Sequence, residues 1–398
     1  MRHIAAQTTI PVPHVYHYGT AAENPTGLGP FIIMDYIEHH QNMSRALRDP
    51  DRSSEERPVL NSNISTEKLE YLYGQMAQIM LQLFSLKFPK IGSLTEKKGE
   101  NDKKFFCVGG RPLIANMNEI IVHTNAPASV LPPESFSSAN EWYCALGDML
   151  MAQLVFQHND AVEDEDDARD KYVARQLFRN LAAEGRLATG SSSENDCILF
   201  SEDFRPANVL LDEDLRIVGV IDWEFACVAP AQWTFDPPWW LLLEDPDWWP
   251  EGYREWMTAY EPRLQTFLRV LEAEEKKAAD KSLAERVGDM SLTSSKKYDT
   301  TLPLSQRMRE SWESQMWMLN YAARKSWAFD FIWWKFLDEK YFGPNEDQDY
   351  HVRINLLTEP QREAMDSFVK RKMEESNDPR IVTWSDQEAT DCLAQVLV

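Results

Sequence analysis

Apolar residues recur every three or four positions in several long segments, and this spacing predicts amphipathic helices. The clearest segment is 67–86, which Thr66 precedes as a candidate N-cap. Its apolar stripe consists of Leu69, Leu72, Met76, Ile79, Leu83 and Leu86. The same spacing predicts further helices over 138–157, 168–187, 253–274, 308–334 and 359–375. Most of the chain is therefore expected to be helical.

Short runs of Val, Ile and Leu predict strands in a few places. Residues 208–211 and 215–221 are two such runs, and the polar segment 212–214 separates them. Two apolar runs joined by a polar turn are typical of a β-hairpin. Two further strands are expected over 15–18 and 30–37, on either side of a glycine-containing loop.

Several segments show neither the helical nor the strand period. Residues 39–63 and 95–104 are polar or charged and are predicted to be surface loops, and 111–133 lacks a clean period. The charged, Ser/Thr-rich segment 278–301 is predicted to be a mobile linker. The acidic run 163–167 lacks the glycine and distal glutamate of a calcium loop, so it is predicted to be a helix N-terminus.

The predicted hairpin carries three polar residues at its two ends. Asp203 and Asn208 precede its first strand and Asp222 follows its second, so the three side chains are expected to meet at one rim. Phosphoryl transfer from ATP needs a carboxylate to orient and deprotonate the acceptor, and oxygen ligands that hold magnesium against the phosphates. The trio supplies this set. The alternative is a polar turn, because Asp, Pro and Asn favour turns for local reasons.

The spacing of these residues resembles a known family. Ser201-x-Asp203-x-x-x-x-Asn208, followed by Ile221-Asp222-Trp223, is similar to the motif of the aminoglycoside phosphotransferase family, also called the kinase-like phosphotransferase enzyme family, and most closely to its fungal members. The resemblance implies Asp203 as catalytic base, Asn208 and Asp222 as magnesium ligands, and ATP as donor. The acceptor implied is a hydroxyl of a small molecule.

Other parts of the chain acquire a role through the same resemblance. Backbone groups of Asp35, Tyr36 and Ile37 would bind the adenine as the hinge, although an ordinary edge strand is the alternative. Arg205 is placed to reach a transferred phosphate, or equally to pair with Glu202 or Glu224. The aromatic segment 236–243 also resembles fungal members. It is predicted to be a buried brace behind the hairpin, with a stacking surface for an aromatic acceptor as the alternative.

The implied architecture is an α+β, protein-kinase-like fold. Residues 1–37 would be the remnant of a small lobe and its hinge, and 38–398 a helical large lobe with the catalytic hairpin at 198–224. The family's phosphate-covering loop and phosphate-binding Lys have no counterpart, because no Lys precedes Lys68. We therefore expect this chain to be a truncated form of a longer product. These gaps, and Ser201 in place of the family's His, also leave open a non-catalytic protein that acts by binding only.

Composition narrows the function classes. The 41 Lys and Arg against 64 Asp and Glu give a net charge of −23, which argues against a nucleic-acid partner. The charge mildly favours cationic or neutral acceptors, or serves solubility alone. Five Cys without a C-x-x-C pair, and no apolar run of membrane length, predict a cytoplasmic protein without a membrane partner. Hydrolase, zinc-protease and Walker motifs are absent from the sequence.

Overall fold

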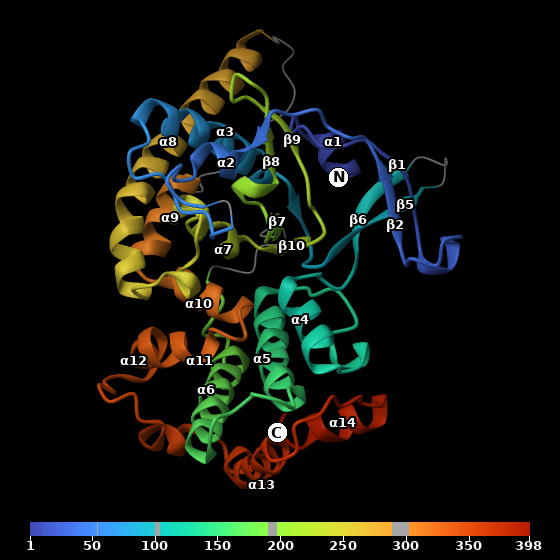
Figure 1. Ribbon diagram of the computed structural model, residues 1–398, viewed down its shortest axis with the longest axis vertical. Helices are drawn as coiled ribbons and strands as arrows, with labels where there is room; N and C mark the ends of the chain where they lie inside the picture. The colour runs from blue at the N-terminus through green and yellow to red at the C-terminus, as the bar shows by residue number, and fades with distance from the viewer. Residues whose placement is uncertain (54, 100–103, 190–196, 289–301) are drawn as a thin grey trace. The chain divides into compact units, whose positions relative to one another are not determined.

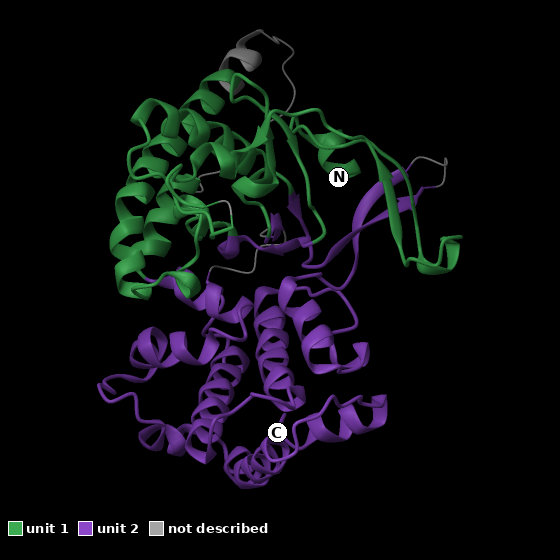
Figure 2. Ribbon diagram, viewed as in Figure 1, with its two compact units in different colours: residues 1–86, 203–224, 234–314 green, residues 87–202, 225–233, 315–398 purple. Residues whose placement is uncertain are grey.

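The computed structural model describes residues 1–398 except 54, 100–103, 190–196 and 289–301 (Figure 1). The chain divides into two compact units, each assembled from separate stretches of sequence (Figure 2). Unit 1 comprises 1–86, 203–224 and 234–314, and unit 2 comprises 87–202, 225–233 and 315–398. All strand pairs described are antiparallel and helices predominate, which confirms the α+β class. No described helix has the length and apolarity required to span a membrane.

Unit 1 contains the predicted hairpin and the helices that support it. Its strands are β1 (Val15–Gly19), β2 (Phe31–Met34), β3 (Gln41–Asn42), β8 (Val209–Leu211) and β9 (Ile217–Val220). Its α-helices are α1 (Arg2–Gln7), α2 (Met43–Leu47), α3 (Thr66–Phe84), α8 (Tyr253–Gly288) and α9 (Leu304–Glu313). The segment 1–37, predicted to be the remnant of a small lobe, lies in this same unit.

Helix α3 confirms the apolar stripe seen in the sequence. Leu69, Leu72 and Met76 are all buried, and the helix packs against α8. Its N-cap is Ser65 rather than the predicted Thr66, because the Ser65 hydroxyl accepts the backbone N–H of Lys68 at 3.3 Å.

The predicted aromatic brace is also buried. Tyr73 of α3 makes edge-on ring contacts with Trp240 and with Phe267 of α8. The hydroxyl of Tyr73 donates to the carbonyl of Leu241 at 2.9 Å, so the segment 236–243 is tied to α3 by a buried hydrogen bond.

The hairpin itself forms as predicted, with β8 and β9 side by side (Figure 1). Val209 pairs with Val220 and Leu211 with Ile217. The turn is stabilised by the carboxylate of Asp212, whose Oδ1 accepts from two backbone N–H groups of the turn. The sequence did not predict β3, which pairs with the other side of β8 to complete a three-stranded sheet. A two-residue strand shows no detectable period.

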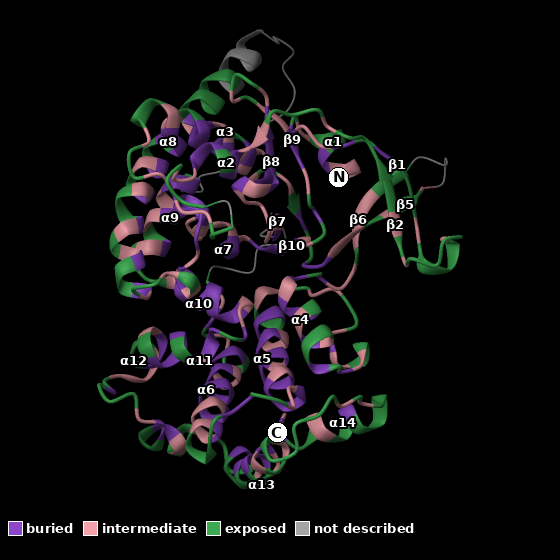
Figure 3. Ribbon diagram, in the orientation of Figure 1, coloured by how far each residue is buried: buried purple, intermediate pink, exposed green. Residues whose placement is uncertain are grey.

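Unit 2 contains a helical core and two small antiparallel sheets. Its helices are α4 (Ala115–Thr124), α5 (Ala139–Phe156), α6 (Glu165–Ala183), α10 (Met316–Arg324), α11 (Phe329–Ile332), α12 (Asp338–Phe342), α13 (Glu359–Ser376) and α14 (Asp386–Ala394). Its strands are β4 (Lys87–Phe88), β5 (Ser93–Lys98), β6 (Lys104–Gly110), β7 (Cys197–Ser201) and β10 (Ala226–Pro230), which α7 (Ala231–Thr234) follows. Figure 3 shows that buried positions are concentrated on α5 and α6, which pack together.

The acidic run of the sequence begins α6, as expected. Asp164 is the N-cap, with its Oδ1 accepting the backbone N–H of Asp167 at 2.9 Å. Glu165, Asp166 and Asp167 occupy the first turn, where the helix dipole favours negative charge. This confirms a helix N-terminus rather than a calcium loop.

Several expectations from the sequence are wrong. Residues 39–63, predicted to be a surface loop, contain β3 and helix α2, whose Met43 and Leu47 are buried. Residues 95–104, predicted as a loop, include much of β5 and the start of β6, a ribbon with charged and exposed residues that break the alternation. The predicted helix over 308–334 is interrupted at Gln315, whose φ of 57° lies outside the helical region. Helix α8 continues to Gly288, so a linker does not begin at 278, and 289–301 lie outside the described residues.

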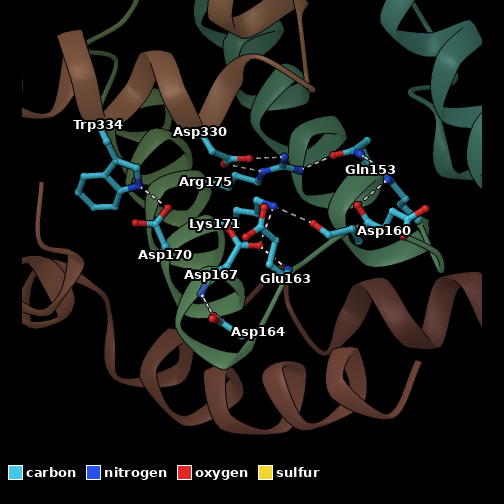
Figure 4. A network of polar contacts seen from close by, with 12 residues as sticks. Gln153, Asp160, Glu163, Asp164, Asp167, Asp170, Lys171, Arg175, Asp330 and Trp334 are labelled. Atoms are coloured by element: carbon cyan, nitrogen blue, oxygen red, sulfur yellow. Dashed lines mark hydrogen bonds and ion pairs between the residues drawn. The ribbon is translucent and has the colours of Figure 1, made fainter. Parts of the chain in front are cut away.

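A polar network connects the core helices of unit 2 (Figure 4). The side chain of Arg175 on α6 is 3% exposed and pairs with Asp330 of α11 at 2.8 Å. The same guanidinium donates to the carbonyl of Leu150 and the side chain of Gln153, both on α5. Nearby, Trp334 Nε1 donates to Asp170 Oδ2 at 2.7 Å. Buried charges of this kind are costly unless paired, and Arg175 is paired on several sides.

Asp170 makes the stability of this network depend on pH. Burial, together with the charges of Asp330 and Asp167, raises the pKa of Asp170 to about 7, against the opposing effects of Trp334 and Lys171. The ordinary pKa is 3.8. The carboxyl group therefore loses its proton at a lower pH in the unfolded chain than in the folded chain. As pH rises from about 4 to about 7, the contribution of Asp170 to the free energy of unfolding falls.

We predict that Asp170→Asn, which keeps an oxygen acceptor for Trp334, raises the free energy of unfolding above pH 7. The gain is on the order of 1 kcal/mol, because water screens the half-buried carboxylate. Urea unfolding across this pH range measures it. An exposed carboxylate of the same unit, in Glu363→Gln, is the control. If the free energy of unfolding of Asp170→Asn depended on pH as strongly as that of the parent chain, Asp170 would not be the group responsible.

Candidate active site

The loop before the hairpin is held closed by one amide group. Asn208 is 7% exposed, and its Nδ2 donates to Asp203 twice, to the backbone carbonyl at 2.9 Å and to Oδ2 at 2.8 Å. A 3₁₀ turn, η3 (Pro206–Asn208), shapes the loop, with the Asn208 N–H donating to the Arg205 carbonyl at 2.9 Å. The structure therefore brings Asp203 and Asn208 together, as the sequence predicted.

This contact also orients the Asn208 side chain. Two acceptor oxygens of Asp203 fix Nδ2 on their side, because an amide oxygen in that position would be repelled. The Asn208 Oδ1 atom consequently faces away from Asp203. Oδ1 lies at the end of the hairpin that also carries Asp222. An amide oxygen in this position is a suitable ligand for a hard cation such as magnesium.

Arg205 pairs with neither of the partners suggested by the sequence. Its Nε lies 2.6 Å from Asp203 Oδ1, an ion pair whose N–H is not aligned for a hydrogen bond. The Arg205 side chain is 42% exposed and that of Asp203 is 26% exposed. Both carboxylate oxygens of Asp203 are thus engaged from within the loop, while the guanidinium keeps access to solvent.

Asp222 ends the hairpin in an unusual backbone conformation. Its φ is 62°, in the left-handed region that Asp and Asn adopt more readily than other side-chain-bearing residues. The preceding Ile221 donates its N–H to the Asn208 carbonyl at 3.0 Å, so Asp222 lies one residue beyond a direct link to Asn208. The Asp222 side chain is exposed. The hairpin thereby places Asn208 and Asp222 at the same end of the sheet.

The predicted hinge lies against the same sheet. β2 ends at Met34, and Asp35 accepts from the hydroxyl of Tyr16 at 2.6 Å. Tyr36 is 76% exposed, whereas Ile37 covers Gly219 of β9. A Cβ at Gly219 would lie 2.5 Å from Ile37 Cδ1, so a larger residue there would require the Ile37 side chain to move. Adenine binding by Asp35, Tyr36 and Ile37 stays a prediction.

One supporting residue could not be recognised in the sequence. Gln75 of α3 donates to the Leu215 carbonyl at 2.9 Å and accepts the Ile217 N–H at 2.8 Å, so it fixes the far end of the hairpin. Gln75 lies beside the apolar stripe of its helix, but a single glutamine carries no signal of its partner.

Part of the chain matches known proteins in sequence. The sequence profile of the phosphotransferase enzyme family matches residues 125–272, which include the whole loop and hairpin. The match confirms the resemblance that the motif from Ser201 to Trp223 indicated.

Curated fungal proteins also match part of the chain. The chain is 35% identical over 101 residues to clavilactone A biosynthesis cluster protein Y of Ampulloclitocybe clavipes. It is 30% and 29% identical over 98 residues to two subtelomeric hrmA-associated cluster proteins of Aspergillus fumigatus. These alignments cover 23% to 25% of this chain. They span 25% of the first relative and 16% of the other two.

The left-handed conformation of Asp222 leads to a prediction about stability. We expect Asp222→Asn to leave the free energy of unfolding nearly unchanged, because Asn tolerates the same φ. Asp222→Val is expected to lower it by roughly 1–2 kcal/mol, because a β-branched side chain crowds the backbone there. Chemical denaturation without nucleotide measures both. Equal stability of the two variants would show that the backbone at Asp222 is not constrained in this way.

Proposed function

We propose that this chain is a phosphotransferase that moves the γ-phosphoryl group of ATP to a hydroxyl of a small molecule. The observation that carries the proposal is the double hydrogen bond from Asn208 Nδ2 to Asp203, at one end of a hairpin that returns to Asp222. The family match supports the reaction class. The chain spans a quarter or less of its curated relatives, so the reaction and its substrates are proposed for this chain on its own residues.

In this proposal Asp203 orients the acceptor and takes its proton. Its carboxylate is restrained by Asn208 on one oxygen and approached by Arg205 on the other. A restrained carboxylate acts as a general base at low reorganisation cost, because its position is set before the acceptor arrives. The proton passes from the hydroxyl to the Asp203 carboxylate as the hydroxyl oxygen bonds to the γ-phosphorus. The bond from that phosphorus to the β–γ bridging oxygen breaks, and ADP leaves.

Asn208 Oδ1 and the Asp222 carboxylate would hold a magnesium ion, and that ion would neutralise negative charge on the phosphates of ATP. The donor set fits, because both are oxygen ligands and magnesium usually takes few ligands from protein. Arg205 is exposed enough to exchange Asp203 for a phosphate oxygen. Asp35, Tyr36 and Ile37 would bind adenine through backbone groups, while Ile37 keeps this segment on β9.

The proposal separates the roles of two carboxylates. Magnesium and ATP together should stabilise the parent chain by about 3 kcal/mol at a hundredfold excess over Kd. Asp222→Asn should abolish that stabilisation. Asp203→Asn should keep it but lower phosphoryl transfer at least about a hundredfold.

Thermal unfolding with ATP, with and without magnesium, measures binding, and release of ADP in an acceptor screen measures turnover. Asp214→Asn is the matched control, because Asp214 lies in the turn of the same hairpin and pairs only with exposed Arg216 among the contacts described. Undiminished magnesium-dependent stabilisation of Asp222→Asn would contradict the proposal. Stabilisation of the parent chain without turnover of any acceptor would favour a protein that binds nucleotide only.

A further inference from the structure

The bend at the end of the hairpin is closed by the side chain that follows it. Trp223 is 8% exposed, and its indole Nε1–H donates to the backbone carbonyl of Val220 at 2.9 Å. Only Ile221 and Asp222 lie between these two partners in the sequence. The hydrogen bond therefore spans the whole bend, including Asp222 with its left-handed φ of 62°.

This hydrogen bond lies on the outer edge of β9. Val220 is the last residue of the strand, and its N–H donates to the Pro11 carbonyl at 2.8 Å. Ile221 turns its N–H the other way, to the Asn208 carbonyl at 3.0 Å. Val220 is 1% exposed, so its carbonyl needs a partner from the protein. The Trp223 indole supplies the donor that a further strand would supply in a wider sheet.

Burial of the ring would explain a tryptophan at this position, but the hydrogen bond does more. In an extended strand, residues three positions apart are separated by about 10 Å along the chain. The bond from Trp223 to Val220 consequently favours a chain that bends back at Asp222. The left-handed conformation is unfavourable for any residue except glycine, so it persists where neighbouring contacts hold it. The indole hydrogen bond is such a contact.

We propose that Trp223 is a positioning residue for Asp222. By closing the bend, the indole would hold the exposed Asp222 carboxylate at the end of the hairpin that carries Asn208 Oδ1. This inference rests on the proposed function, in which these two oxygens bind magnesium. Trp223 itself touches neither the ion nor the nucleotide in the proposal. Without the hydrogen bond, Asp222 would adopt other backbone conformations for part of the time, and the apparent magnesium affinity would fall by the same fraction.

Trp223→Phe tests the proposal, because it keeps an aromatic ring and removes the N–H donor. The unfolding midpoint of the full chain is measured with a non-hydrolysable ATP analogue at increasing magnesium concentration, which gives the apparent Kd for magnesium. The variant should raise this Kd about threefold to tenfold, the effect of losing one hydrogen bond. The shift caused by the analogue without magnesium should stay the same. A variant with the Kd of the parent chain would overturn the proposal.

Trp256→Phe is the matched control. Trp256 is 1% exposed and lies in the same unit, and its Nε1 donates to the Glu244 carbonyl at 2.9 Å. This variant therefore loses a buried hydrogen bond of the same kind outside the hairpin. Both variants should lower the midpoint without nucleotide, but only Trp223→Phe should weaken magnesium binding. An equal loss of magnesium affinity in both would indicate a general effect of lower stability and would refute the positioning role.

A measurement without nucleotide separates this inference from the proposed function. Asp222→Val should lower the free energy of unfolding less in the Trp223→Phe background than in the parent chain, because the released backbone can leave the left-handed region. Additive effects of the two substitutions would refute the inference even if magnesium binds as proposed. Non-additive effects in a chain that magnesium does not stabilise would instead refute the proposed function, with the bend still assigned to Trp223.

A second replacement covers the case in which Trp223→Phe does not fold. Benzothienylalanine at position 223 carries sulfur in place of the N–H group and keeps the size of the indole ring. It takes the place of phenylalanine in both measurements, and the same outcomes support or refute the proposal.

Discussion

The hydrogen bonds from the buried amide of Asn208 to Asp203 are the interaction on which the candidate site depends. A buried amide must find partners, since an unsatisfied donor costs on the order of 1–3 kcal/mol. Asp203 supplies both its carbonyl and its carboxylate, so the requirement of burial sets the shape of the loop. The same bonds turn Oδ1 outward. In the proposed function, folding would use the nitrogen of this amide and magnesium binding would use its oxygen.

The hairpin extends this constraint to Asp222. Pairing of β8 with β9 returns the chain to Asn208, whose carbonyl accepts from Ile221. The left-handed turn at Asp222 then ends the strand. Support comes from two directions, because Gln75 holds the far end of the hairpin and Ile37 lies on Gly219. A site assembled on paired strands is restrained more tightly than one on an isolated loop.

Much of this could be predicted, and the successes share a physical basis. The stripe of α3 and the hairpin at 209–220 are local patterns, in which the hydrophobicity of each residue indicates whether its position is buried. The contact between Asp203 and Asn208, and the return of the chain to Asn208 just before Asp222, followed from the geometry of a hairpin. The β5–β6 ribbon was missed because charged residues on exposed strands hide the two-residue period. The break at Gln315 carries no Gly or Pro to mark it.

Contacts between distant residues could not be predicted from one sequence. The pairing of Arg205 with Asp203 depends on the 3₁₀ turn between them. The hydrogen bond from the Ala115 N–H to the Glu202 carboxylate joins residues that are 87 positions apart in the sequence. The most direct test of the central claim is a crystal structure with magnesium and a non-hydrolysable ATP analogue. Our account predicts one magnesium ion with Asn208 Oδ1 and an Asp222 oxygen each at about 2.0–2.1 Å. A nucleotide-bound magnesium that neither residue touches would contradict it.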